Sequence, residues 1–386
     1  MPLGRVVMEL RVSAKNPRNS EGAFVALKDG RILFAYTKFI GDRTDEGSAV
    51  IAARYSSDEG RTWTTRDRVI VPNEARQNVM SVSLLRLSDG RIALFYLRKN
   101  GPHDCRLWMR TSRDEARTFS RARCCIPAPG YFVVNNDRVV QLSSGRLVVP
   151  AAYHRFRAPR LDEKAGIDSM SLAICFLSDD LGRTWREGNR WRACPDNCYT
   201  GLQEPGVVEP GDRRALGDCP AAGDRPQAVR RKPRALFSWA RTTLGCQYVM
   251  RSRDGGEMWS RPRRSEFMSP SSPMSVKRIP ATGHLLAIWN DRSGRFKRLG
   301  KPAEVTRERT PLVAAISLDE GRTWRRHTLI ERDPRMGFCY TAVHFTADGH
   351  VLLAYCAGGR KPAYILSHLR VRRIPVGAFD GSRFLR

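Results

Sequence analysis

The amino-acid sequence predicts an all-β protein, specifically a six-bladed β-propeller made of four-stranded antiparallel blades. Two interleaved patterns predict this fold. One is a box of the form Ser-x-Asp-x-Gly-x-Thr-Trp that occurs five times, and the other is a glycine-containing turn before a short apolar run. The box aspartates are 56, 66, 74 and 65 residues apart along a chain of 386 residues. This spacing leaves room for about six units. We therefore expect one domain over residues 1–386.

Each box follows an apolar or alternating run, as at Leu312 to Ile316, and therefore begins where a strand ends. The aspartate can accept hydrogen bonds from backbone N–H groups, glycine supplies a positive φ, and the aromatic residue packs back between sheets. We expect structural hairpin turns far from any catalytic centre. The box aspartates are Asp58, Asp114, Asp180, Asp254 and Asp319.

The second pattern alternates with the boxes along the chain. Asp29-Gly30 and Asp89-Gly90 each precede a short apolar strand, and three later turns behave alike. Each unit is thus strand, turn, strand, strand, box, strand, which describes one antiparallel blade. Residues 211–234, rich in Arg, Pro, Gly and Ala, interrupt the fourth unit. We expect a surface loop insertion there.

The charge of the chain is strongly positive, with 67 Lys and Arg against 39 Asp and Glu and a net charge of +28. Arginine is spread along the whole chain instead of forming blocks, and no nucleic-acid-binding module is present. We therefore expect no nucleic-acid partner. A basic surface that is simply solvated is compatible with one that attracts anionic substrates.

Cysteine usage and the first residues suggest where the protein works. The ten cysteines do not form a disulfide framework, and the only metal-like spacing, Cys194-x3-Cys198, lacks a second ligand pair. We expect no metal and no cofactor. Charges within the first fifteen residues leave no signal-peptide core, and no run is long enough to span a membrane. These features predict a cytoplasmic protein, although a start further upstream would permit export.

Three arginines, each in a separate unit, are candidates for binding an anionic group. Arg18 lies just before the first Asp-Gly turn, in Asn-Pro-Arg-Asn-Ser-Glu. Arg241 ends the run Phe-Ser-Trp-Ala-Arg, and Arg309 precedes the apolar run that leads into the last box. Guanidinium groups that come from different blades can clamp one carboxylate between them.

Two acids and a tyrosine join these three arginines as candidate site residues. Asp45 comes shortly before the first box, and Glu204 lies in mid-chain in Leu-Gln-Glu-Pro-Gly-Val. Tyr340, in Cys-Tyr-Thr-Ala-Val, stands eight residues before the last Asp-Gly turn. In residue type and order, these six residues resemble the catalytic set of the sialidases (neuraminidases), which are Asp-box, or BNR-repeat, six-bladed β-propellers. The resemblance covers nearly the whole chain.

The resemblance implies an exo-α-sialidase-like glycoside hydrolase that releases terminal sialic acid, or a related acidic sugar, from glycoconjugates. It implies Tyr340 as nucleophile, Glu204 as its base and Asp45 as acid/base, with Arg18, Arg241 and Arg309 binding the sugar carboxylate. A neutral tyrosine avoids the repulsion that a carboxylate nucleophile would meet, and sialidases are the known tyrosine exception among glycosidases. Such a mechanism retains anomeric configuration without a metal.

The chain departs from the family pattern at a few places. Tyr36 and Lys38 stand where an acidic residue and an arginine are often found. Cys356 replaces a glutamate that often orients the first arginine, a role that Glu21 can take instead. Asp42 and Glu46 are rivals of Asp45, Arg307 is a rival of Arg309, and Tyr36 and Tyr355 are alternatives to Tyr340.

A different function stays open: a non-catalytic Asp-box propeller that binds acidic glycans or a protein partner. The two hypotheses differ in whether the three arginines converge on one central pocket that faces Tyr340 and Glu204. The oligomeric state is left open by the sequence.

Overall fold

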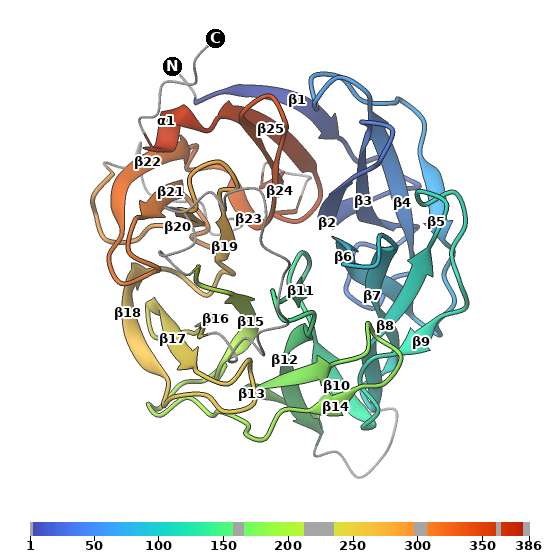
Figure 1. Cartoon of the computed structure of the whole chain (residues 1–386). Coiled ribbons are helices and arrows are strands. Elements are labelled where there is room, and N and C mark those ends of the chain that lie inside the picture. The colour runs from blue at the N-terminus through green and yellow to red at the C-terminus, as the bar shows by residue number, and fades with distance from the viewer. Residues whose placement is uncertain (1–2, 157–165, 212–234, 297–306, 360–363, 381–386) are drawn as a thin grey trace, which may run out of the picture.

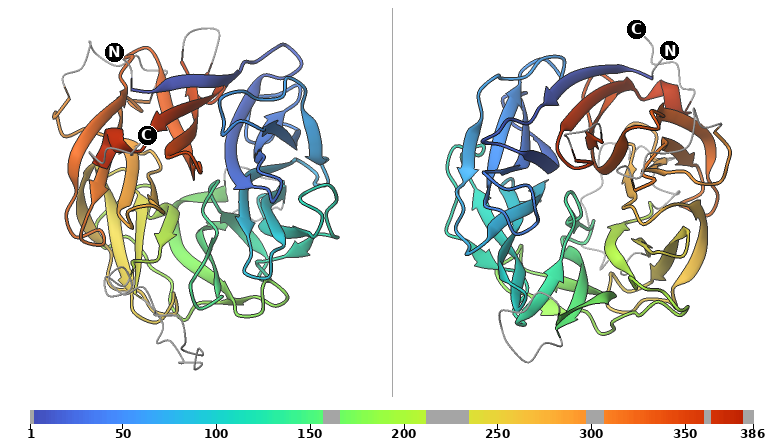
Figure 2. Two further views of the ribbon diagram at one scale, coloured as in Figure 1. Left: turned by 45° about the horizontal axis from the view of Figure 1, so that its top comes forward. Right: turned by 180° about the vertical axis from the view of Figure 1, so that it is seen from behind.

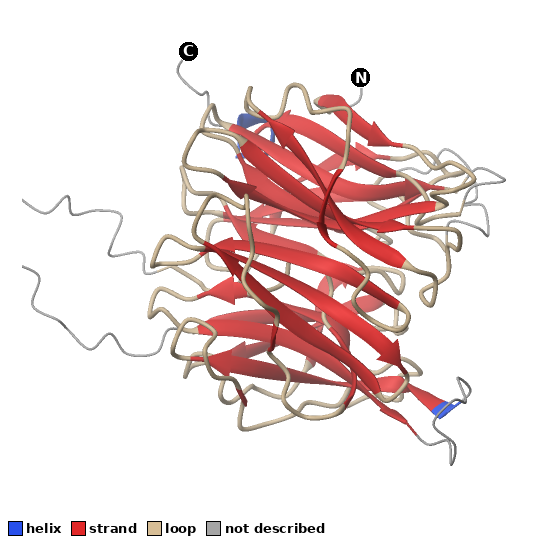
Figure 3. Cartoon of the chain, turned by 90° about the vertical axis from the view of Figure 1, so that its right-hand side faces the viewer, coloured by secondary structure: helices blue, strands red, loops and turns tan. Residues whose placement is uncertain are grey.

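The structure is a computed structural model that describes residues 3–156, 166–211, 235–296, 307–359 and 364–380. These residues form 25 β-strands and one short α-helix, α1 (Gly377–Asp380). Figure 3 shows strands through the whole thickness of the molecule and almost no helix. The all-β class predicted from the boxes is therefore confirmed.

Four sheets have four antiparallel strands each. The first contains β2 (Arg18–Ala26), β3 (Ile32–Phe39), β4 (Ala49–Ser56) and β5 (Arg68–Val71). Another contains β15 (Gln203–Val208), β16 (Leu236–Arg241), β17 (Cys246–Ser252) and β18 (Arg263–Met268). The next contains β19 (Ser275–Arg278), β20 (Leu285–Asn290), β21 (Leu312–Ser317) and β22 (Arg325–Glu331). The last contains β23 (Gly337–Phe345), β24 (His350–Gly358), β25 (Leu369–Pro375) and β1 (Arg5–Leu10).

The remaining strands form one nine-stranded sheet. Its first part contains β6 (Asn78–Arg86), β7 (Ile92–Gly101), β8 (Asp104–Ser112) and β9 (Arg123–Cys124). Its second part contains β10 (Gly130–Val133), β11 (Val140–Gln141), β12 (Leu147–Phe156), β13 (Ile167–Ser178) and β14 (Arg186–Glu187). Only a short parallel pairing joins the parts, between β8 and β10 at Gly130↔Asp104 and Tyr131↔Cys105.

The sheets follow one another around the molecule in chain order, as the colours in Figure 1 show. Inner strands of neighbouring sheets contact each other: β2 contacts both β6 and β23, and β15 contacts both β12 and β19. The strand β1 completes the sheet of the last three strands by pairing antiparallel with β25, from Arg5↔Arg373 to Leu10↔Leu369. Both ends of the chain therefore lie on the same side (Figure 2).

The hydrophobic core lies between successive sheets. Phe34 of β3 packs with Leu352 of β24, and both are almost fully buried. The two parts of the nine-stranded sheet also enclose a core of their own, in which Phe95 of β7 packs with Phe176 of β13. Apolar side chains on both faces of each sheet thus find a partner, which explains the long buried runs in the inner strands.

The Asp boxes form the turns that follow the third strand of each unit. In the first box, Asp58 accepts hydrogen bonds from Thr62 N at 2.9 Å, Thr62 Oγ1 at 2.6 Å and Ser56 Oγ at 2.8 Å. Gly60 has φ 78° and donates to Ser56 Oγ at 2.9 Å. The same pattern recurs around Asp319, and Ala116 takes the glycine place in the second box with φ 62°. The boxes are the structural turns that the sequence predicts.

We expect Asp58→Ala to lower the melting temperature while leaving kcat of the folded protein nearly unchanged. The carboxylate satisfies turn N–H and hydroxyl groups, and the loss of such a cap costs about 0.5–2 kcal/mol of unfolding free energy. Differential scanning fluorimetry measures the stability, and initial rates on an active-site-titrated sample measure turnover. An unchanged melting temperature with a collapsed kcat would contradict the structural role.

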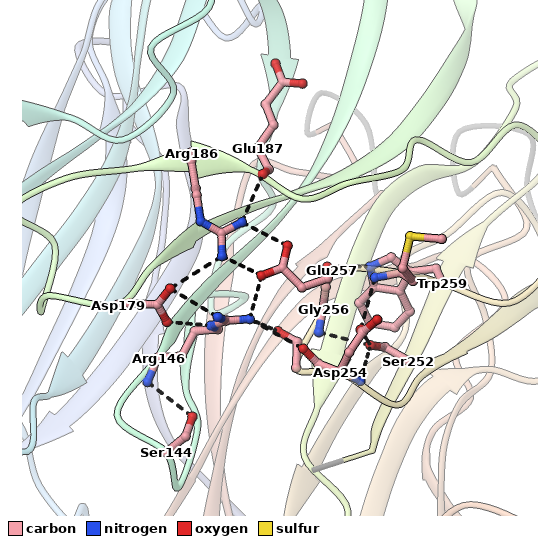
Figure 4. Close-up of polar contacts among 12 residues, drawn as sticks. Ser144, Arg146, Asp179, Arg186, Glu187, Ser252, Asp254, Gly256, Glu257 and Trp259 are labelled. Carbon is pink, nitrogen blue, oxygen red and sulfur yellow. Dashed lines mark hydrogen bonds and ion pairs between the residues drawn. The ribbon is translucent and has the colours of Figure 1, made fainter. Parts of the chain in front are cut away.

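Ion pairs also connect neighbouring sheets at the surface, as in Figure 4. Arg146 contacts Asp179 at 2.6 Å and Glu257 at 3.0 Å, and Arg186 contacts the same two acids. The pairs tie strands β12 and β14 to the turn of the fourth box. A single ion pair at the surface contributes little to the free energy of unfolding. In a shared network, each contact costs less side-chain entropy. Part of the large basic charge is thus neutralised locally.

Two further expectations from the sequence concern a loop insertion and membrane-spanning segments. The loop insertion predicted at 211–234 falls, except for Gly211, outside the described residues. Among the residues that the structure describes, no helix is long and apolar enough to cross a membrane.

Candidate active site

A cavity of about 270 Å³ collects most of the residues that the sequence singled out. Five of the six predicted site residues line it: Asp45, Glu204, Arg241, Arg309 and Tyr340. They come from four different sheets, so the fold brings together residues that are far apart in the chain. The sixth, Arg18, is 1% exposed and lies behind the cavity wall.

Four of the strands that reach this cavity share one backbone irregularity. In β2, β6, β15 and β23 the antiparallel register shifts at a bulge, and a non-glycine residue there has a left-handed φ. A bulge turns a side chain away from the normal alternation, and left-handed backbone is costly for such residues. Each bulge residue lines the cavity: Glu21 (φ 56°), Ser81 (φ 59°), Glu204 (φ 47°) and Tyr340 (φ 58°).

Tyr340 and Glu204 form the centre of the site. Tyr340 Oη donates a hydrogen bond to Glu204 Oε1 at 3.2 Å, as expected from the sequence, and both residues are buried. Burial, and then the negative charge of Glu204, raise the pKa of Tyr340 far above its usual range, against the charges of Arg241 and Arg309. The phenol is therefore neutral, and its proton already points at an acceptor.

Two arginines flank this pair. Arg241 contacts Glu204 Oε2 at 3.2 Å and donates to Gln203 Oε1 at 2.7 Å. Arg309 lies 5.4 Å from the Tyr340 ring centre and is 5% exposed. It donates to Ser271 O and Cys339 Sγ, both at 3.1 Å, and pairs with no carboxylate among the described residues. A buried guanidinium without a carboxylate favours an anionic ligand at this wall.

The Cys339 thiol is a direct partner of Arg309, whose Nη1 donates to Sγ at 3.1 Å. It faces Cys356 across the β23–β24 pairing, in the register Cys339↔Cys356. Burial would raise the pKa of Cys339, but hydrogen bonding with Cys356 and the charge of Arg309 lower it to about 7. Cys356, the residue that replaces the expected glutamate, is thus buried opposite Cys339 and does not line the cavity.

Arg18 is held by two carboxylates. Its Nη1 donates to Asp45 Oδ1 at 2.6 Å, and its Nη2 lies 3.6 Å from Glu21 Oε1. Glu21 therefore takes the orienting position suggested by the sequence. Burial raises the pKa of Glu21 to about 7, against the charge of Arg18. Partial desolvation by the surrounding protein acts upward on the pKa of Asp45, but the charges of Arg18 and then of Lys99 and Arg241 bring it below the usual range.

Two of the three rival residues named from the sequence, Asp42 and Glu46, lie outside the cavity wall. Asp42 accepts hydrogen bonds from Thr44 of its own loop, and Glu46 lies 3.6 Å from Lys99. Neither lines the cavity, whereas Arg307 does, together with Arg309.

The alternative tyrosines are also outside the cavity wall. Tyr355 donates to Glu331 at 2.7 Å, and Tyr36 is buried in β3. Lys38, at a position where the sequence departs from the family pattern, pairs with Asp67 at 2.6 Å.

Some cavity residues have no signal in the sequence. Lys99 is 5% exposed, donates to the backbone oxygen of Asp45 at 3.1 Å and lies 5.4 Å from the Tyr131 ring centre. Gln203 adjoins Glu204 in the same motif and could have been suspected from it. Lys99 lies near the end of β7, as many surface lysines lie near strand ends, so its place in the sequence did not single it out. Within the described residues, no group of three or more His, Cys, Asp or Glu side chains is placed to hold a metal ion.

Comparisons with known proteins place this geometry in a family context. A family model described as a BNR repeat-like domain matches residues 30–353. No curated protein sequence matches the chain. Solved structures do match it, and the three described next share 14–16% sequence identity with it.

A protein of unknown function from Dyadobacter fermentans has a TM-score of 0.68 at 16% identity, covering 97% of this chain and 100% of that one. The K499G mutant of the NanB sialidase from Streptococcus pneumoniae has a TM-score of 0.67 at 14% identity, with coverages of 98% and 71%. The intramolecular trans-sialidase from Ruminococcus gnavus has a TM-score of 0.66 at 14% identity, with 98% of both chains covered. The fold is thus shared with sialidases, and because the family model spans most of the sequence, the chain belongs to the family of BNR repeat-like domain proteins.

Proposed function

We propose that this protein is a retaining exo-glycoside hydrolase that releases terminal sialic acid, or a related acidic sugar, from glycoconjugates. The observation that carries the proposal is the Tyr340–Glu204 hydrogen bond, flanked by Arg241 and Arg309 in one cavity. A simple glycan-binding surface has no need of a buried phenol bonded to a carboxylate. This contact therefore favours an enzyme over a non-catalytic propeller.

The proposed reaction has two steps. Arg241 and Arg309, with Arg18 behind them, bind the sugar carboxylate. Glu204 takes the phenolic proton while Tyr340 Oη attacks the anomeric carbon, and Asp45 protonates the departing glycosidic oxygen. Asp45 then removes a proton from water, which attacks the anomeric carbon, and Tyr340 leaves and regains its proton from Glu204. Two inversions give net retention, with no cofactor in either step.

We also infer that the sheets are six propeller blades around a central axis. The nine-stranded sheet divides naturally at the two-residue parallel pairing of β8 with β10. A separate hydrophobic core between its two parts supports this division. The cavity then lies where first strands of successive blades meet, the usual place for a propeller site.

We expect the purified protein to hydrolyse a fluorogenic α-sialoside, such as the 4-methylumbelliferyl glycoside, and to leave the matching β-galactoside intact. The galactoside lacks the carboxylate that the arginines bind, so it is the matched neutral control. Fluorescence release measures turnover, and proton NMR of the first product identifies its anomer. Binding of the sugar without any turnover would instead support the non-catalytic alternative.

A further inference from the structure

The guanidinium of Arg18 cannot be reached from the cavity in the free protein. Arg18 is 1% exposed, and its Nη1 is occupied by Asp45 at 2.6 Å. The Asp45 side chain itself is 59% exposed at the cavity wall. A carboxylate of the protein thus occupies the arginine that, under the proposed function, binds the carboxylate of the sugar.

The surroundings allow Asp45 to leave without a rearrangement of its loop. Its backbone oxygen accepts hydrogen bonds from Asn78 Nδ2 at 2.7 Å and Lys99 Nζ at 3.1 Å, which anchor the main chain. Rotation of the Asp45 side chain would break this ion pair, and Nη1 would keep its hydrogen bond to Arg43 O, which is 3.4 Å long. The cation does not lose all compensation either, because Glu21, 4% exposed, remains beside it with its Oε1 3.6 Å from Nη2. Glu21 is thus the fixed carboxylate beside Arg18, and Asp45 is the replaceable one.

We propose that Asp45 is an internal stand-in for the substrate carboxylate, which displaces it from Arg18 and thereby releases it to act as the general acid. This inference rests on the proposed function and adds a specificity device to it. A sugar without a carboxylate leaves Asp45 in its ion pair, where it is ionised and cannot protonate a leaving group. A carboxylated sugar takes over Arg18, and Asp45 then takes a proton from solvent and holds it near the glycosidic oxygen.

The test measures binding and needs no turnover. The ligands are the unsaturated 2,3-dehydro analogue of N-acetylneuraminic acid and its methyl ester, titrated calorimetrically into wild type and Asp45→Asn. We expect Asp45→Asn to bind the acid about three- to tenfold more tightly, since the competing ion pair is gone. The ester, which has no carboxylate, should bind both proteins equally.

The matched control is Glu46→Gln, which removes the same charge from the adjacent residue. Glu46 lies 3.6 Å from Lys99 and is not an ion-pair partner of Arg18, so its variant removes a nearby negative charge and leaves the Arg18–Asp45 pair in place. We expect it to gain less than twofold in affinity for the acid. Equal gains in the two variants, or no gain in Asp45→Asn, would overturn the inference. No binding of either ligand to any of the three proteins would overturn the proposed function as well.

Proton uptake gives a second readout in the same experiment. Displacement from Arg18 raises the pKa of Asp45, so the wild type should take up more protons on binding the acid than Asp45→Asn does. Titration in buffers of different ionisation enthalpy measures this difference. Subtraction removes the contributions of the other charged or titratable groups that face Asp45, namely Arg18, Glu21, Lys99, Cys105, Tyr131 and Arg241. Equal uptake by the two proteins would argue that Asp45 stays in place.

Discussion

Tyr340→Phe should lower kcat on a sialoside by on the order of 10³-fold or more, while the fold and the affinity for the carboxylated sugar survive. The change removes one oxygen atom, which is the proposed nucleophile, and leaves the ring that packs near Arg309. Glu204 would then have no proton to accept, so neither step of the proposed reaction could proceed. Steady-state kinetics on the fluorogenic sialoside gives the size of the loss.

A mechanism-based label separates this role from a structural one. A 3-fluorinated sialosyl fluoride should form a covalent adduct with the wild type, and peptide mapping should locate it on Tyr340. Tyr355→Phe is the matched control, because Tyr355 is equally buried but donates to Glu331 outside the cavity. That variant should still be labelled. An adduct on another residue would disprove the assignment, and an inverted product would disprove the two-step mechanism.

Arg309→Ala should weaken the binding of the 2,3-dehydro sialic acid analogue by about 2–5 kcal/mol, which corresponds to roughly 30-fold or more. Arg309 is buried at the cavity wall and has no carboxylate partner among the described residues, so the ligand would supply the missing anion. The methyl ester should lose much less affinity, since it brings no charge to the site. Calorimetric titration of both ligands gives the comparison.

The control for this variant is another buried arginine. Arg372 is 4% exposed and pairs with Glu331 at 2.7 Å, away from the cavity. Arg372→Ala should lower the melting temperature without distinguishing the acid from the ester. If Arg309→Ala weakened both ligands to the same extent, a carboxylate clamp would be the wrong description of this wall.

The architecture could be predicted because its signals are local and repeated. Each box encodes a complete turn within eight residues, so five copies mark five strand ends without any tertiary information. The resemblance to the sialidases, and not the spacing, singled out Glu204 and Tyr340, which the structure places at bulges in β15 and β23. What spacing does not reveal is that β8 and β10 pair in parallel, because that contact depends on how two neighbouring units approach each other.

The details of the site were less accessible from the sequence. The bulges that turn Glu21 and Tyr340 into the cavity depend on single left-handed residues, and glutamate or tyrosine in that conformation has no compositional signature. The sequence grouped Arg18 with the other two arginines, yet its guanidinium lies behind Asp45. A single side-chain contact, between Arg18 and Asp45, accounts for this position. Ion pairing across 27 residues cannot be inferred from residue order alone.

The pairing of β1 with β25 affects how the protein is made. On the ribosome, Arg5 to Leu10 emerge before the other described strands, and their partner strand is synthesised more than 350 residues later. At about 5–20 residues per second, the first strand waits roughly 20–70 s with its backbone groups unpaired. During that interval it is a free edge that can pair with another nascent chain. The sheet that contains β1 and β25 therefore cannot form before β25 has been synthesised, so the rate of synthesis, and not the rate of diffusion, sets the earliest time at which this sheet can form.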